Sequence, residues 1–438
     1  MLNKIKQILI NHKEISGYKI GETIIEANEL FFIKKNVDMD RAKSVHHFKV
    51  TVYIDFEEKG TKYKGSSTTD IHPTMSDSEL EKAIGEAAFA AQYVKNPYYP
   101  LVKPSSSYKQ MGGSNLSKES LPYWMNEITK AIYKNDIYEK GGINSCEIFL
   151  NKIYTHAVNS EGIDIDSLDY ECMIEFITTW KEDGEEIELY KCLNFSEYDP
   201  ESLAGEVMDM ITICKEKAIA KNMPALGRAC VIITREAVKD LFSYYYSKSN
   251  ATTVYNQGST WKIGDKVQGE EVKGDYITMT LNPLMKNSTF SRSFDEDGFP
   301  VEPVTIIEKG VLKNYVANSR YAHYLNVEPT GSVINLEVNA GKNSIDDMKK
   351  EPHLEIAAFS DFSVDGITGD FGGEIRLGWY FDGDKTIPVT GGSITGNINE
   401  MHHDLYLSKE LQKDNYFEGP KAVKLFNVTV AGIDNINE

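Results

Sequence analysis

The sequence lacks several features that would assign it to a function class at once. Its 5 cysteines include no Cys-x-x-Cys pair, so neither a disulfide framework nor a cysteine zinc site is indicated. It has no apolar run long enough for a signal peptide or a bilayer-spanning helix, so we expect a cytoplasmic protein without membrane contact. His-Glu-x-x-His, P-loop and dinucleotide-binding glycine patterns are also absent from the chain.

Positive charge is scarce. The chain has 47 Lys and Arg against 66 Asp and Glu, which gives a formal net charge of −19. An acidic surface repels phosphate groups, so nucleic acids and anionic membranes are disfavoured as partners. Only six residues are arginine, and five of these lie between positions 228 and 376. Because the planar guanidinium suits geometrically exact recognition, this distribution places the more specific polar chemistry in the second half.

The order of hydrophobic patterns predicts an α+β fold. An N-terminal α/β region, residues 1–222, shows the order helix, three strands, helix twice, as an αβββα duplication with repeats 1–95 and 119–219. The segment 96–118 is rich in Pro, Gly and Ser and is interpreted as a linker. The remaining residues, 223–438, are rich in strand and turn patterns and predict a mostly antiparallel β domain.

Local signals support these elements. Residues 46–56 alternate apolar and polar side chains, as expected for a half-buried strand. Ser76 and Glu79 have the spacing of a helix-opening capping box. Thr234 follows an apolar strand-like run and is expected to cap the next helix.

The segment 366–396 contains nine of the 32 glycines. Such density indicates either tight β-turns or a strand edge at which an extended peptide could pair. Two other polar clusters favour ordinary interpretations. Asp295-Glu296-Asp297-Gly298 lacks the spacing of a calcium loop and is expected to be a solvated acidic turn. His402-His403 is interpreted as a surface pair rather than part of a metal site.

Several segments, taken in order, resemble the TldD/PmbA (TldE) family. They are Asn159–Gly162, Phe294–Pro300, Ile307–Lys313, Tyr315, Arg320, Thr330-Gly331, Gly372–Gly378 and Pro388–Asn397. The resemblance implies paired cytoplasmic proteins that trim peptides, including microcin maturation and antitoxin turnover. An older family label, modulator of DNA gyrase, does not imply DNA contact. In that family the TldD-type subunit resembles a zinc metallopeptidase that uses His-Glu-x-x-x-His on a helix and a distal cysteine, whereas the TldE/PmbA type lacks these ligands.

This chain departs from the catalytic pattern. The resemblance places the metal helix after the strand 229–234, but the helix there, residues 236–246, contains no histidine. The last cysteine is Cys230, so the later region supplies no thiolate. The resemblance therefore implies a TldE/PmbA-type subunit with no catalytic residue, metal or other cofactor of its own. The zinc is expected in a TldD-like partner, and the subunit itself is expected to be inactive alone.

The expected role is to bind that partner and to help form the cleft for unfolded peptide. The residues predicted for the cleft are Glu374, Arg376, Gly391, Gly392, Ser393, Gly396 and Asn397. For Glu374 and Arg376, an internal ion pair that only holds the fold is an equal alternative. Two other functions stay open: a stand-alone hydrolase using groups such as Ser393, Glu374, His402 and His403, and a homodimeric peptide-binding scaffold.

Overall fold

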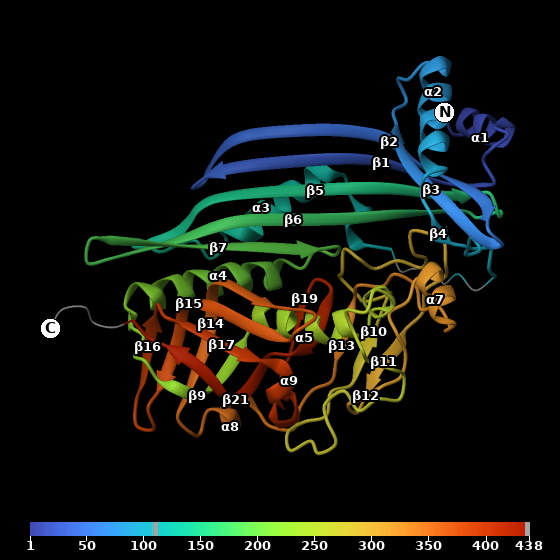
Figure 1. The fold of residues 1–438 in the computed structure, drawn as a ribbon. Helices are drawn as coiled ribbons and strands as arrows, with labels where there is room; N and C mark the ends of the chain where they lie inside the picture. Colours follow the sequence, from blue (N-terminus) through green and yellow to red (C-terminus); the bar gives the residue numbers. More distant parts are fainter. Residues whose placement is uncertain (107, 109–112, 434–438) are drawn as a thin grey trace.

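The N-terminal half is one curved antiparallel sheet with helices packed on it (Figure 1). The computed structural model describes residues 1–106, 108 and 113–433. The strand order is β4-β3-β2-β1-β5-β6-β7. The elements are α1 (Leu2–Asn11), β1 (Gly17–Ile33), β2 (Asn36–Glu58), β3 (Thr61–Ile71), α2 (Asp77–Ala91), β4 (Asn96–Pro97), α3 (Leu121–Tyr133), β5 (Gly141–Asn159), β6 (Asp164–Glu182), β7 (Glu185–Phe195) and α4 (Pro200–Ala218), with a 3₁₀ turn at Asn115–Lys118.

This sheet is built from two copies of the same element order. The first is α1, β1, β2, β3, α2 and the second is α3, β5, β6, β7, α4. The two copies meet where β1 and β5 pair antiparallel at the centre of the sheet. The predicted order is therefore confirmed, whereas the predicted domain and repeat boundaries stay predictions. Residues 107 and 109–112 of the predicted linker lie outside the described residues.

The local signals account for these elements. In β2, Phe48, Val50 and Val52 are fully buried on one face, where α1 and α2 pack, as the alternating pattern predicts. The capping box at α2 is also confirmed, because Ser76 accepts a hydrogen bond from the Glu79 amide while the Glu79 carboxylate accepts one from the Ser76 amide at 2.8 Å.

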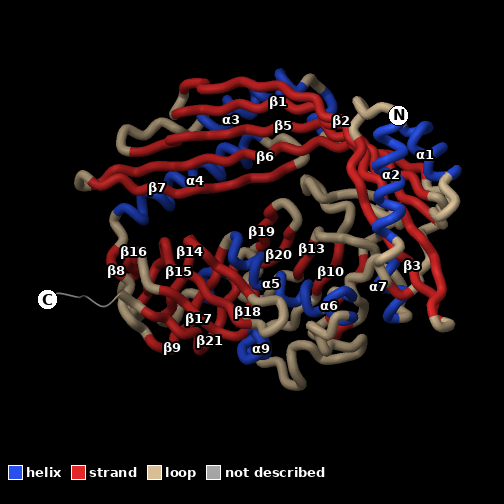
Figure 2. The backbone as a smooth tube through the Cα atoms, turned by 45° about the horizontal axis from the view of Figure 1, so that its top comes forward, coloured by secondary structure: helices blue, strands red, loops and turns tan. Residues whose placement is uncertain are grey.

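The C-terminal half contains two further sheets and is mostly antiparallel, as predicted. One has the order β14-β9-β21-β17-β15-β16-β8, and an additional pairing of β14 with β15 closes its first five strands into a ring. The other has the order β12-β11-β10-β13-β20-β19. β19 is the last strand of this second sheet, and it lies close to β7 in both views of the backbone (Figures 1 and 2).

The elements of this half are β8 (Lys221–Asn222), β9 (Gly227–Thr234), α5 (Glu236–Lys248), α6 (Ala251–Tyr255), β10 (Met279–Leu281), β11 (Val304–Glu308), β12 (Val311–Leu312), α7 (Ser319–Leu325), β13 (Leu336–Val338), α8 (Ile345–Met348), β14 (His353–Val364), β15 (Asp370–Phe381), β16 (Thr386–Thr390), β17 (Ser393–Asn397), α9 (Ile398–Met401), β18 (Tyr406–Leu407), β19 (Leu411–Asp414), β20 (Phe417–Pro420) and β21 (Ala422–Ala431), with a 3₁₀ turn at His402–Asp404. Most of them are short; the longer ones are helix α5 and the strands β9, β14, β15 and β21.

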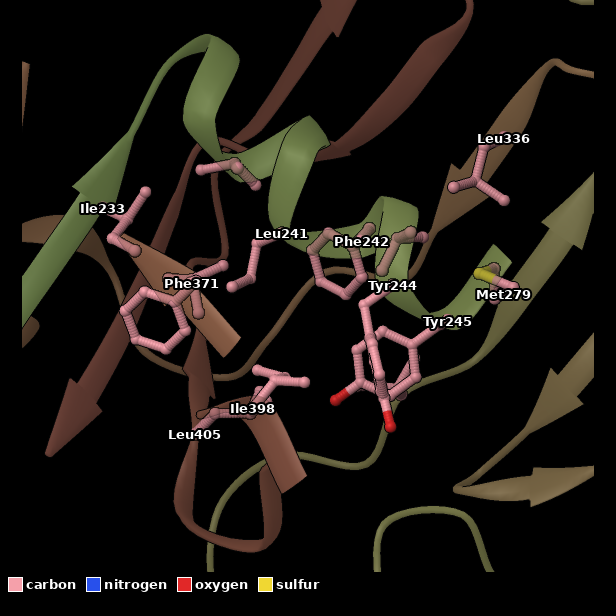
Figure 3. Close-up of a cluster of buried hydrophobic side chains, with 14 of the residues drawn as sticks. Ile233, Leu241, Phe242, Tyr244, Tyr245, Met279, Leu336, Phe371, Ile398 and Leu405 are labelled. Atoms are coloured by element: carbon pink, nitrogen blue, oxygen red, sulfur yellow. The ribbon is translucent and has the colours of Figure 1, made fainter. Parts of the chain in front are cut away.

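Helix α5 forms the centre of the C-terminal core (Figure 3). Its apolar side chains, among them Leu241, Phe242 and Tyr245, are buried between the two sheets. His402 packs against Tyr245 with ring centroids 6.4 Å apart and is buried. The prediction of a surface histidine pair is therefore wrong for His402, because the 3₁₀ turn after α9 directs that ring into the core.

Helix α4 joins the two halves. It packs on β6 and β7, and the same apolar cluster includes Ala357 of β14 and Leu377 of β15. In Figure 1 this helix lies between the N-terminal sheet and the C-terminal strands. Among the described residues, none of the helices has the length and apolarity needed to cross a bilayer.

Candidate cleft at the start of helix α5

A cavity of about 940 Å³ lies where the two halves meet. One wall comes from β7 and α4. The opposite wall comes from the junction of β9 and α5, from β14 and β15, and from β19. Its lining mixes apolar with charged side chains: Leu193, Phe195, Leu203, Trp379, Phe381 and Leu411 alternate with Lys191, Glu206, Asp209, Arg235, Glu236, Glu355 and Lys413.

Ion pairs link these walls. Lys191 of β7 contacts Glu236 in the first turn of α5 and lies 3.8 Å from Glu206 of α4. Arg235 makes two hydrogen bonds to the Asp209 carboxylate, one of them 3.0 Å from Nη2 to Oδ1. Burial lowers the pKa of Lys191, against the opposing effect of the carboxylates of Glu206 and Asp414. The charged groups are thus held by one another across the seam between the halves.

A further ion pair fixes the position of β19 at the cavity. The Lys239 ammonium on α5 lies 2.6 Å from a carboxylate oxygen of Asp414. Burial alone would favour the neutral amine of Lys239, but the attraction of Asp414 outweighs it and raises the pKa. Together with the hydrogen bond that Gln412 donates to the Arg235 carbonyl at 2.9 Å, this pair holds the strand against the start of the helix.

Arg235 has an unusual backbone conformation. Its φ of 60° and ψ of −137° lie in a region that glycine occupies far more easily than other residues. Arg235 is also the N-cap of α5, and its side chain makes no capping hydrogen bond. The predicted cap, Thr234, donates its hydroxyl instead to the carbonyl of Ile356 at 2.8 Å, so that prediction is wrong. From this position the guanidinium lines the cavity and contacts Asp209.

Two sheet edges border the cavity. β7 is the last strand of the N-terminal sheet and β19 is the last strand of its own sheet, and both contribute lining residues. Edge strands present unpaired backbone amides and carbonyls. An extended peptide can bind such an edge through main-chain hydrogen bonds, with its side chains in the flanking apolar pockets. The arrangement therefore suits a peptide backbone rather than one specific side chain.

The lining does not fit a zinc ion. A catalytic zinc site takes three protein ligands of the His, Cys or carboxylate type. Within residues 1–106, 108 and 113–433, no group of three or more such side chains could hold a metal ion. His353 is the single histidine in the cavity lining, and its Nδ1 lies 2.7 Å from the Glu351 carbonyl. The ion pairs occupy the start of α5, where the resemblance would place the metal ligands.

The seven residues predicted for the cleft lie elsewhere. They gather on β15, on β17 and in the turn between β16 and β17, and none of them lines the cavity. Glu374 is paired across the sheet with Ser393, and Asn397 is paired with Asp370. Gly391 and Gly392 adopt φ values of 79° and 73°, which the tight turn requires. Their role at a peptide cleft stays a prediction.

Glu374 and Arg376 do not form the internal ion pair that was the alternative for them. Both side chains are exposed, and the structure has no salt bridge between them. The Ser360 hydroxyl donates to Glu374 at 2.9 Å. That alternative is therefore wrong, because β15 presents both side chains to solvent.

The charged residues of the cavity were not identified from the sequence. Lys191, Asp209 and Arg235 come from three different elements and belong to no motif. One signal was available, because Arg235 is one of the six arginines and follows directly after a buried strand.

Comparison with known proteins finds a family model that matches the C-terminal part of the chain and relatives that are similar in sequence. Residues 226–432 match the family model described as the PmbA/TldA metallopeptidase C-terminal domain. An uncharacterized protein of Methanocaldococcus jannaschii is 25% identical over 434 residues, covering 92% of this chain and 97% of that protein. The metalloprotease PmbA of Escherichia coli O157:H7 is 24% identical over 200 residues, covering 44% of each chain. The aligned stretches thus cover about half of this chain and about half of these PmbA relatives.

Solved structures share the whole fold. The crystal structure of TldE from Thermococcus kodakarensis has a TM-score of 0.76 at 17% identity and covers 98% of this chain and 100% of that one. A protein from Thermotoga maritima, whose structure is titled as that of a modulator of a DNA gyrase, has a TM-score of 0.78 at 17% identity. The match covers 99% of this chain and 100% of that one. At this identity the similarity concerns the fold.

Proposed function

Because this chain belongs to the PmbA/TldD metallopeptidase family, we propose that it is a metal-free subunit of a TldD/TldE-type zinc peptidase. It binds a TldD-like partner that carries the zinc, and it helps to hold unfolded peptide for cleavage. Its place in the cell is the cytoplasm, and its biological role is proteolysis and peptide maturation. Neither nucleic acid nor membrane is a partner, in keeping with the net charge of −19.

One observation carries the proposal. At the start of α5 the cavity is occupied by the pairs Lys191–Glu236 and Arg235–Asp209. Two cations directly beside the carboxylates would repel a divalent metal ion and compete for the same oxygens. A site with this charge pattern can bind the polar backbone of a peptide, but it has no means of activating a water molecule through a metal.

The peptide is held by the two strand edges that border the cavity, β7 and β19. Backbone pairing explains a preference for unfolded chains, because only an extended segment has free amides and carbonyls along one side. In this proposal the exposed set on β15 and β17, including Glu374, Ser393 and Asn397, belongs to the larger cleft that forms with the partner.

The partner surface is the open face of the N-terminal sheet. Met39 and Val45 of β2 point to the side opposite to Phe48 and the helices α1 and α2, and their side chains are exposed. Apolar residues exposed on a sheet face favour association. The ion pairs of Glu29 with Arg41 and Lys43 lie on the same face and would provide specificity.

The test measures zinc content and cleavage of an unfolded peptide, first for this chain alone and then mixed with the TldD-like protein of the same genome. We expect zinc and cleavage only when the TldD-like protein is present. Cleavage is expected to be faster in the mixture than with the TldD-like protein alone. Loss of a general acid or base lowers the rate of an enzyme by about 10²–10⁴-fold. Because Glu236 does not have that role in this proposal, the mixture with the Glu236→Gln variant is expected to keep at least about a tenth of its cleavage rate.

The outcomes separate the three functions. Zinc or cleavage with the isolated chain would overturn the proposal in favour of a stand-alone hydrolase. A stable homodimer that binds peptide but never associates with the TldD-like protein would favour the scaffold. Complete loss of cleavage with Glu236→Gln, in a variant that still forms the complex, would show that this chain contributes a catalytic carboxylate.

A further inference from the structure

A second cavity, of about 250 Å³, lies at the other end of the seam between the halves. Its walls come from β1, β2 and β3, from the segment 99–102, from the turn at Glu296-Asp297 and from the start of α7. Segments that carry the family resemblance meet here, because Asn159, Asp297 and Arg320 all line it. The peptide cavity at α5 uses none of these residues.

Four charged side chains line this cavity, and their charges sum to zero. Lys19 and Asp297 form an ion pair at 2.6 Å. Within the described residues, neither Arg320 nor Glu296 has a partner of opposite charge. Arg320 donates only to neutral groups, to Asn96 Oδ1 at 2.7 Å and to the Tyr324 hydroxyl at 3.2 Å. The cavity therefore offers one unpaired cation and one unpaired carboxylate.

The Arg320 guanidinium is held in place before any ligand arrives. Its central carbon lies 5.3 Å from the Tyr99 and Tyr321 ring centroids and 5.5 Å from that of Tyr324. Cation–π contacts and two hydrogen bonds restrict its rotamers, so little entropy is lost when a ligand binds. An arginine fixed in this way is suited to a carboxylate, which it can bind with two parallel hydrogen bonds.

Hydroxyl groups supply the remaining polarity. Thr51 and Thr68 are hydrogen-bonded to each other at 2.8 Å, and Tyr53 and Tyr99 lie beside them in the lining. Burial raises the pKa of both tyrosines, so they stay protonated and can donate. The Ser319 hydroxyl oxygen is buried and has no hydrogen-bond partner among the described residues.

From this arrangement we propose that the second cavity binds a small zwitterion of the α-amino acid class. Its carboxylate pairs with Arg320, and its ammonium group faces Glu296 and Asp297. The lining has a net charge of zero. A ligand with both charges keeps the occupied cavity neutral, whereas a simple anion or cation would not. The volume equals that of about eight waters at ~30 Å³ each, which suits one amino acid rather than a peptide strand.

The test is isothermal titration calorimetry of the full isolated chain with L-serine and L-glutamine. Each is compared with its amide, which lacks the carboxylate, and with its N-acetyl derivative, which lacks the ammonium group. We expect at least one amino acid to bind and both of its derivatives to bind at least about tenfold weaker. The comparison uses the unaltered protein, so it does not depend on any variant folding.

Variants then locate the site. Arg320→Gln is expected to weaken binding at least about tenfold, and Glu296→Gln several-fold. The matched control is Arg228→Gln. The Arg228 side chain donates a hydrogen bond to the carbonyl of Asn427 and does not line the cavity. Circular dichroism checks that each variant folds.

Three results would overturn the inference: no heat with either amino acid at millimolar concentration, derivatives that bind as tightly as the amino acid, or an Arg320→Gln variant with unchanged affinity. A tripeptide that binds as tightly as the free amino acid would contradict the size argument. The measurement needs neither the TldD-like partner nor peptide cleavage, so its failure leaves the proposed subunit role untouched.

Discussion

Arg235 and Asp209 form a two-point ion pair that crosses from the β9–α5 junction to helix α4. Both side chains are partly exposed to the large cavity, so the pair by itself is worth about 1 kcal/mol or less. The Arg235 backbone, however, is strained, and such strain costs on the order of 1–3 kcal/mol. The chain therefore keeps an arginine where glycine would relieve the backbone strain, which is what we expect if the cavity uses the guanidinium.

Replacing Arg235 by glycine tests this relationship. Release of the backbone strain is expected to offset the lost ion pair and the added flexibility of glycine, so the free energy of unfolding stays unchanged or rises by about 1 kcal/mol. Peptide cleavage by the mixture with the TldD-like protein is expected to fall severalfold, because the cavity loses a fixed cation. Thermal unfolding and the cleavage rate are measured on the same samples.

The matched control is Lys59→Gly. Lys59 also has a positive φ, 52°, but it lies in the turn between β2 and β3, away from the cavity. This variant is expected to gain stability without loss of cleavage. Equal loss of cleavage in both variants, or a strong destabilisation by Arg235→Gly, would contradict the assignment of the strain to function.

Val45→Asp tests the partner surface. Val45 is 38% exposed on the open face of the N-terminal sheet. The aspartate carboxylate therefore stays in water in the isolated chain and is buried, at a cost, only when the partner covers this face. We predict that the isolated variant folds normally and that its affinity for the TldD-like protein falls at least about tenfold, as measured by calorimetry. Ile10→Asp is the control, because Ile10 is 68% exposed on α1 and lies outside that face. Equal affinities for the two variants would exclude this face as the interface.

Much of the fold was predictable because its signals are local. The alternation around Phe48 and the capping box at Ser76 act within a few residues, and each is confirmed in the structure. The repeated helix–strand order follows from the same local patterns. The C-terminal ring needs β9 to pair with β14 and with β21, and these strands lie far apart in the sequence. No local pattern encodes that closure.

The site was less predictable for a physical reason. Charged residues such as Lys191 and Asp209 ordinarily face solvent, so nothing in their neighbourhood distinguishes them from other surface charges. The acidic turn was expected to be solvated, yet Asp295 is buried and accepts three backbone amide hydrogen bonds, from Asp297, Phe299 and Ser332. Only the neighbouring Glu296 is exposed. Such burial depends on contacts that the sequence pattern does not show.

His402 gives a prediction for acid stability. Burial lowers its pKa to about 4, with a smaller contribution from His403, whereas an unfolded histidine titrates near 6.5. The folded state therefore favours the neutral ring, and its stabilising contribution is lost as the pH falls from about 6.5 toward 4. The full effect is on the order of 3 kcal/mol. We predict that His402→Phe, which keeps the stacking on Tyr245, flattens the fall of the melting temperature in this range, whereas a change of an exposed histidine such as His72→Phe does not.

Asp295 has the opposite pH dependence. Burial, with a smaller effect from Asp297, raises its pKa to about 6. The folded state thus favours the protonated acid, and this contribution, on the order of 3 kcal/mol, is lost as the pH rises through 6. Asp295→Asn cannot ionise, so the wild-type protein is predicted to lose stability relative to this variant between about pH 4 and 6.5, the interval between the unfolded and folded pKa values. The new amide beside the Ser332 amide adds a cost that is the same at every pH, so only the slope is informative. Denaturant unfolding measured across this range decides the matter, and parallel stability curves for the two proteins would show that Asp295 does not titrate there.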